Sequence, residues 1–142
     1  MSARDTRGGR RVLVVEDEAD LLATYERLLG RQGYEVTTAT SRAGGLAALR
    51  AATGEHRLDL VICDLRLNDG DGLEVVRAAR GTANPPSVIV ITGYPSDETR
   101  RAARAAGATA FFAKPFAAAA LLAAVRSSLA PIAPAASGEQ KS

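Results

Sequence analysis

The 142-residue chain has one cysteine, one histidine and no tryptophan, and aromatic residues make up 4% of it. Cys63 has no second thiol with which to form an internal disulfide or a structural zinc site, and its place at the end of an apolar run predicts a buried side chain. No apolar stretch approaches the roughly 20 residues of a bilayer-spanning helix, and the four apolar residues after the basic start are too few for a signal sequence. We therefore expect no membrane insertion and a cytoplasmic location.

Positive charge is concentrated at the start of the chain. The first eleven residues carry a formal charge of +3, whereas the whole chain carries +2, so the remainder is slightly acidic. The sequence has no basic face, helix-turn-helix extension or aromatic-rich platform that would contact nucleic acid. We expect residues 1–10 to form a flexible basic arm, and we do not expect this chain to bind DNA directly.

Short apolar runs alternate with segments of helical periodicity along the chain. The runs with the composition of buried strands are Val12–Val15, Tyr34–Ala39, Leu58–Cys63, Ser87–Ile91 and Thr109–Ala113. The first, third and fourth are the most apolar, as central strands of a parallel sheet are. This alternation predicts an α/β domain over residues 11–129, with a parallel sheet covered by helices on both faces. Residues 130–142, rich in Pro, Ala and Ser, are expected to form a disordered tail or the start of a linker.

Polar side chains follow four of the five predicted strands. Glu16 and Asp17 come directly after the first strand, Asp64 after the third, Thr92 after the fourth and Lys114 after the fifth. In a doubly wound sheet, ligands bind outside the carboxyl ends of the strands. Each residue also has a simpler explanation, because acids can face helix amino termini and a threonine can cap a turn. We prefer the simpler explanation for a second group of acids: Glu18, Asp20, Asp69 and Asp71.

Lys114 stands out because 16 of the 18 basic residues are arginines, and the other lysine is Lys141 in the tail. An ammonium group provides a compact point charge with rotatable donors, which a planar guanidinium cannot reproduce. We therefore predict a specific role for Lys114.

The combined pattern resembles the receiver domain of two-component response regulators, the CheY-like family, from Arg11 to Leu129. The features that match the family are the acidic pair Glu16 and Asp17, Asp64 with Gly72 eight residues later, Thr92, and the pair Lys114 and Pro115. The resemblance implies a flavodoxin-like (βα)5 fold, a doubly wound five-stranded parallel sheet in the order 2-1-3-4-5. Neighbouring first and third strands would bring Asp17 close to Asp64.

The resemblance also implies a chemistry. Asp64 would accept a phosphoryl group from the phosphohistidine of a sensor histidine kinase or a histidine phosphotransfer protein. Glu16, Asp17, Asp64 and the backbone carbonyl of Arg66 would hold Mg²⁺, the implied cofactor. Thr92 and Lys114 would stabilise the transferred group. The signal would pass to a downstream protein target or to an effector domain.

Several positions are expected to tune this chemistry. In the family pattern Thr92 and Phe111 would form the conformational switch that reshapes the face of the fourth helix, the last strand and the last helix. Tyr94 and Arg66 lie two residues beyond Thr92 and Asp64 and would obstruct the hydrolytic water. Asn68 replaces the proline that is usual after the phosphoacceptor, which should make that loop looser. Family likeness also predicts a cis peptide bond between Lys114 and Pro115.

Other functions fit the sequence less well. A haloacid-dehalogenase-type phosphatase would need a second Asp two residues after Asp17, where Ala19 stands, and a nucleotide hydrolase would need a GxxxxGK[ST] loop. His56 lies in a polar segment and is expected to be a solvated loop residue rather than a phosphoryl donor. The serious alternative is a receiver-like binding module that works without phosphorylation.

Overall fold

Five parallel strands form the central sheet of the computed structural model, which describes residues 9–129. The strands are β1 (Arg11–Val15), β2 (Glu35–Ala39), β3 (Leu60–Asp64), β6 (Ser87–Thr92) and β7 (Ala110–Ala113). Their order, β2-β1-β3-β6-β7, is the predicted 2-1-3-4-5 order of the flavodoxin-like fold. The most apolar runs, now β1, β3 and β6, are central, as expected. Most of the predicted basic arm and all of the tail at 130–142 lie outside the described residues.

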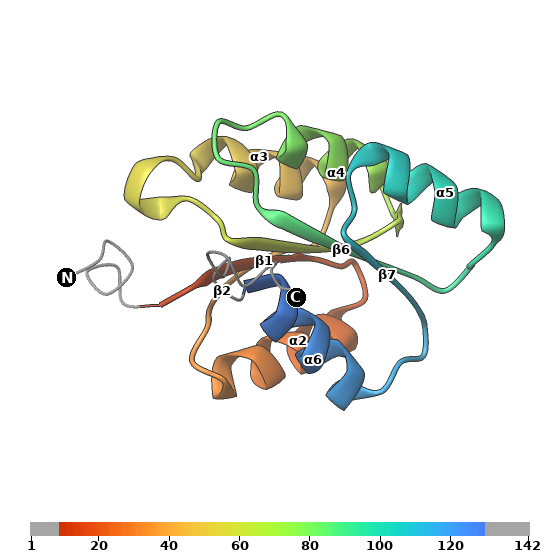
Figure 1. The fold of residues 1–142 in the computed structure, drawn as a ribbon, viewed down its shortest axis with the longest axis horizontal. Coiled ribbons are helices and arrows are strands. Elements are labelled where there is room, and N and C mark those ends of the chain that lie inside the picture. Colours follow the sequence, from red (N-terminus) through yellow and green to blue (C-terminus); the bar gives the residue numbers. More distant parts are fainter. Residues whose placement is uncertain (1–8, 130–142) are drawn as a thin grey trace, which may run out of the picture.

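Helices cover both faces of the sheet. They are α2 (Ala19–Arg31), α3 (Arg42–Ala51), α4 (Leu73–Arg80), α5 (Asp97–Ala106) and α6 (Ala118–Leu129), with a short 3₁₀ helix, η1 (Gly54–His56). Figure 1 shows α3, α4 and α5 on one face and α2 and α6 on the other. Among residues 9–129, no helix has the length and apolar character that crossing a membrane requires. His56 lies in η1 and is exposed, as predicted.

Two hydrophobic cores result from the alternation of side chains along the strands. In β1, Leu13 and Val15 pack with residues of α3 and α4, whereas Val12 and Val14 pack with residues of α2 and α6. Cys63 is fully buried in the first of these cores, which confirms its predicted environment. Because the central strands are buried on both faces, their sequences are continuous apolar runs.

The strand register brings the carboxyl ends of four strands to one edge of the sheet. Val15 of β1 pairs with Cys63 of β3, so the residues that follow each of them lie side by side. Asp64 then pairs with Ile91 of β6, one residue before Thr92. The polar residues predicted at strand ends are therefore gathered at this edge.

A short hairpin after β3 was not predicted. It consists of β4 (Arg66–Leu67) and β5 (Gly70–Asp71), which pair in antiparallel fashion. Two-residue strands have no detectable periodicity in a sequence. The hairpin occupies the loop in which Asn68 replaces proline; whether that loop is looser stays a prediction.

Candidate functional site

Three acidic side chains meet at the carboxyl edge of the sheet. Glu16, Asp17 and Asp64 each offer a carboxylate oxygen, and these oxygens lie within 4.8 Å of one another. Glu16 and Asp64 are buried, with 1% and 5% of their surface exposed. The structure thus brings together three of the residues that sequence analysis assigned to a metal site.

Lys114 lies against this cluster. Its Nζ donates to Asp64 Oδ2 at 2.7 Å and lies 3.2 Å from Glu16 Oε1 and 3.6 Å from Glu18 Oε1. Burial alone would lower the pKa of Lys114, but the hydrogen bond and charge of Asp64, together with Glu16, raise it above its ordinary value. Lys114 is therefore a protonated donor aimed at the phosphoacceptor candidate. Glu18, expected to face the amino terminus of a helix, is the N-cap residue of α2 and also lies near Lys114.

The surroundings of Glu16 disfavour its ionised form. Burial, followed by the negative charge of Asp64, raises the pKa of Glu16 to about 7. One ammonium faces three carboxylates, so negative charge at the cluster is in excess. Carboxylate oxygens are the ligands that Mg²⁺ prefers, and a divalent cation would relieve the repulsion that raises the pKa of Glu16. By donor type, spacing and charge, the cluster fits a magnesium ion.

The carboxylate of Asp64 is held in a defined orientation. Lys114 occupies Oδ2, while Oδ1 accepts the backbone N–H of Arg66 at 3.0 Å. Behind it, Gly72 packs directly on the Asp64 carbonyl and donates its N–H to the Leu65 carbonyl at 2.9 Å. There is no room for a side chain at position 72, which explains why glycine stands eight residues after Asp64.

Thr92 and Tyr94 line the other side of the site. Thr92 is buried, and its Oγ1 accepts the backbone N–H of Tyr94 at 3.1 Å. A hydroxyl that accepts one hydrogen bond can still donate its own proton. The ring of Tyr94 lies beneath the guanidinium of Arg66, whose Cζ is 4.1 Å from the ring centroid. Arg66, Thr92 and Tyr94 help to line a pocket of about 330 Å³ between the hairpin and α5.

Phe111 lies outside the acidic cluster. It is half-buried on β7, paired with Val90, and packs against the core beneath α3, α4 and α5. The guanidinium of Arg100 on α5 lies over its ring, with Cζ 4.6 Å from the centroid. This cation–π contact was not anticipated, since the two residues belong to different elements. The predicted cis peptide bond at Lys114–Pro115 is present.

Two of the acids set aside in the sequence analysis, Asp69 and Asp71, bind backbone N–H groups at helix starts. Asp71 accepts the backbone N–H of Leu73 at the start of α4, as the simpler explanation implies. Asp69 instead accepts two backbone N–H groups at the start of α3, a helix that precedes it in the chain. No local signal could reveal this, because Asp69 and Arg42 are 27 residues apart.

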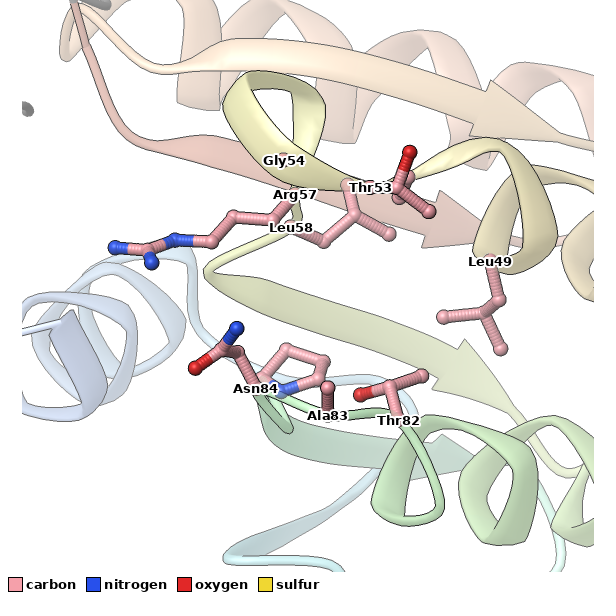
Figure 2. A pocket seen from close by; sticks show the side chains of 10 residues that line it. Leu49, Thr53, Gly54, Arg57, Leu58, Thr82, Ala83 and Asn84 are labelled. Carbon is pink, nitrogen blue, oxygen red and sulfur yellow. The ribbon is translucent and has the colours of Figure 1, made fainter.

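A second pocket lies away from this site. A hollow of about 310 Å³ lies between the segment around η1 and the loop before β6. Figure 2 shows side chains that line it, among them Leu49, Arg57 and Asn84. Leu58 and Pro86, which line it, precede β3 and β6. It therefore lies at the amino ends of the strands, away from Asp64 and Thr92, and it is not part of the candidate site.

Comparison with known proteins agrees with this geometry. Residues 12–126 match the response regulator receiver domain family. The transcriptional regulatory protein PrrA of Mycobacterium tuberculosis is 42% identical over 119 residues, which cover 84% of this chain and 49% of PrrA. The transcriptional regulatory protein KdpE of the same species is 41% identical over 105 residues, covering 74% and 44%. The chain thus spans about half the length of these curated relatives.

Solved structures agree as well. A CheY-like receiver domain from Methanospirillum hungatei superposes with a TM-score of 0.78 at 30% identity, covering 84% of this chain and 93% of that one. A receiver domain from Clostridium thermocellum gives a TM-score of 0.75 at 28% identity, covering 84% and 94%. Together with the family match over most of the chain, these findings identify it: the chain belongs to the response regulator receiver domain family of two-component systems.

Proposed function

We propose that this chain is a phosphoacceptor that takes a phosphoryl group onto Asp64 with the help of Mg²⁺. The observation that carries the proposal is the environment of Asp64: a buried carboxylate, bonded to Lys114 and to the Arg66 N–H, beside two further acids. A structural carboxylate has little need of two acidic neighbours, whose repulsion costs stability. The domain would catalyse its own phosphorylation and slow dephosphorylation, but its output would be a signal.

The transfer follows from the groups around Asp64. A carboxylate oxygen of Asp64 attacks the phosphorus of a phosphohistidine; the new P–O bond forms as the P–N bond breaks, and the leaving imidazole nitrogen keeps the electron pair and takes up a proton. Lys114, now bonded to Asp64, can donate to a phosphoryl oxygen once that carboxylate has become an acyl phosphate. Thr92 can donate its hydroxyl proton to a second phosphoryl oxygen. These donors stabilise charge on the transferring group.

The metal would be held by Glu16, Asp17 and Asp64, and by the backbone carbonyl of Arg66. When bound, Mg²⁺ supplies positive charge that screens these carboxylates and neutralises the incoming phosphoryl group. Glu16 stands where the family more often has Asp. Its longer side chain lies 3.2 Å from Lys114 through Oε1, and its Oε2 accepts the Glu18 N–H. Glu16 would bind the metal directly or through water, and these two contacts limit how far its side chain can move.

The donor is a protein that carries a phosphohistidine, either a sensor histidine kinase or a histidine phosphotransfer protein. An apolar recess of about 400 Å³ adjoins Lys114 and supports the docking of such a protein. Leu21, Leu28, Pro115 and Phe116 contribute apolar surface to it. The downstream partner is a protein target or an effector domain, in keeping with the transcriptional regulators that this chain resembles over half their length.

The output switch is proposed to couple Thr92 to Phe111. Bonding of Thr92 to the phosphoryl group would draw it towards Asp64, and Phe111 would move into the space released beneath α5. Arg100 covers the outer face of the Phe111 ring, so the same movement would break a cation–π contact and change the surface of α5. Packing and charge would thus both report phosphorylation.

Incubation with acetyl phosphate and Mg²⁺ tests the proposed function. We expect one phosphoryl group to be added, with the adduct labile to hydroxylamine, mapping to Asp64, and missing from the Asp64→Asn variant. Mass spectrometry of intact protein and of peptides measures this directly. A wild-type chain that stays unmodified in Mg²⁺ would favour the alternative, a receiver-like module that binds partners without phosphorylation.

The Arg66–Tyr94 stack should lengthen the life of the adduct. Both side chains line the pocket beside Thr92 and contact each other through a cation–π interaction. We expect the Arg66→Ala, Tyr94→Ala double variant to lose its phosphoryl group several-fold faster than wild type. Tyr94→Phe keeps the ring and serves as the matched control, with a lifetime close to wild type. Equal or slower decay in the double variant would mean that the stack does not screen the site.

A further inference from the structure

The hairpin after the phosphoacceptor is fastened to a helix that lies elsewhere in the chain. Asp69, at its turn, accepts the backbone N–H of Arg42 through Oδ1 at 2.7 Å and that of Ala43 through Oδ2 at 2.9 Å. These are the first two amides of α3, and such amides are otherwise unpaired in a helix. An ionised carboxylate is a strong acceptor at this end of a helix, where the dipole is positive.

The Arg42 side chain closes over the same hairpin. Its Nε donates to the Asp69 carbonyl at 3.3 Å, and its terminal nitrogen contacts Glu74 of α4 at 2.5 Å. A Cβ added to Gly70 would lie 2.6 Å from Arg42 Nε, so the side chain runs directly across the Gly70 backbone. Gly70 also has a φ of 151°, which L residues rarely adopt. The turn is thus held directly by α3 and, through the Arg42 side chain, indirectly by α4.

The other end of the hairpin touches Asp64. Leu67 pairs with Gly70 and Arg66 with Asp71, so the anchored turn is two residue pairs away from the Arg66 backbone. The Arg66 N–H donates to Asp64 Oδ1 at 3.0 Å. A shift at Asp69 would therefore move the backbone of Arg66. Both the Arg66 N–H, which orients Asp64, and the Arg66 carbonyl would be displaced.

We propose that Asp69 is a positioning residue for the phosphoacceptor site, which it serves by fastening the β4–β5 hairpin, together with Arg42, to the start of α3. The inference rests on the proposed function, because it takes the Arg66 carbonyl as a metal ligand. It also accounts for Asn68. Proline would fix one φ of this loop. With Asn68 in its place, the loop depends on the bonds between Asp69 and the start of α3 to hold its conformation.

Asp69 also caps α3, and this effect must be separated from its effect on the hairpin. Ser41 provides the control. Ser41 is the N-cap residue of α3, and its Oγ accepts the Gly44 N–H at 2.9 Å. Ser41→Ala removes a cap from the same helix without removing a bond to the hairpin. Asp69→Ala removes the hydrogen bonds to the Arg42 and Ala43 N–H groups, and with them both the capping of α3 and the attachment of the hairpin. Asp69→Asn keeps a carbonyl oxygen that can accept one of the two N–H groups.

The test uses the full chain without metal and then with Mg²⁺ alone. Amide exchange by NMR in the metal-free protein reports on the hairpin through the Arg66 and Gly72 N–H groups. We expect Asp69→Ala to speed exchange at both and to weaken Mg²⁺ binding by roughly tenfold, the lower end of the range for residues that support metal ligands. Asp69→Asn should recover part of both losses. Ser41→Ala should leave exchange at Arg66 and the affinity for Mg²⁺ close to wild type.

Two results would overturn the proposal. One is unchanged exchange at Arg66 in Asp69→Ala; the other is a loss of Mg²⁺ affinity in Ser41→Ala as large as in Asp69→Ala, which would reduce the effect to helix capping. Asp17→Asn, which removes a proposed metal ligand, sets the scale of a full loss of binding. If wild type itself does not bind Mg²⁺, the proposed function fails, and the exchange comparison alone decides whether Asp69 positions Arg66.

Discussion

Gly72→Ala is expected to destabilise the protein by about 3 kcal/mol, the upper end of the cost of overpacking. A Cβ at this position would fall far inside van der Waals contact with the Asp64 carbonyl oxygen and would lie 3.0 Å from Leu65 Cα. These are backbone atoms, so no side chain can rotate away to make room. Gly72 has helical dihedral angles, and its requirement for glycine is therefore one of space rather than of conformation. Either the start of α4 or the end of β3 must move.

Urea unfolding measures the effect, and Gly30→Ala is its matched control. Gly30 lies in α2, and no atom would come within 4 Å of its added Cβ. Alanine there should raise the free energy of unfolding by roughly 0.5 kcal/mol, because it favours the helix more than glycine does. The two variants should therefore shift the midpoint in opposite directions. A Gly72→Ala midpoint equal to wild type would mean that the junction of β3 and α4 is not tightly packed.

The fold class could be predicted from the sequence because short apolar runs, most pronounced in β1, β3 and β6, alternate with helical segments, whereas the strand order was implied by the resemblance to receiver domains. Strand order, helices on both faces and the burial of Cys63 all agree with the structure. The strand bounds were less accurate. Leu58 precedes β3, which begins at Leu60, and the carboxylate of the residue between them, Asp59, accepts the Arg11 N–H. Side-chain bonds of this kind leave no trace in an apolar pattern.

The gathering of Glu16, Asp17, Asp64 and Lys114 could also be predicted, since each follows a strand whose carboxyl end reaches the same edge. What could not be predicted were the contacts between elements far apart in the chain. The stacks of Arg66 on Tyr94 and Arg100 on Phe111, and the bonds from Asp69 to α3, depend on the packed positions of loops and helices. Their residue types are common on surfaces, so composition alone gives no reason to single them out.

Lys114→Met is expected to change two properties of the site in opposite directions. Phosphorylation by acetyl phosphate should slow by on the order of 10²-fold, because an electrostatic donor to the transferring group is lost. Affinity for Mg²⁺ should instead rise by roughly tenfold or more. Two unit charges about 4 Å apart interact by ~1 kcal/mol even at the dielectric constant of water, and a divalent ion doubles this repulsion from the ammonium. Lys114 lies 2.7 Å from Asp64 and 3.2 Å from Glu16, so it competes with a cation for the same oxygens.

Magnesium titration by calorimetry and adduct formation by mass spectrometry measure the two effects on one preparation. Lys114→Arg keeps the charge and should leave Mg²⁺ affinity near wild type, while still slowing phosphorylation because a planar guanidinium cannot match the bonds of an ammonium. In metal-free buffer Lys114→Met should also unfold at lower urea, since the three carboxylates lose their counter-charge, and added Mg²⁺ should restore most of that stability. Weaker Mg²⁺ binding in Lys114→Met would mean that the lysine orders the acids for the metal instead of competing with it, and the balance of charge inferred for this site would then be wrong.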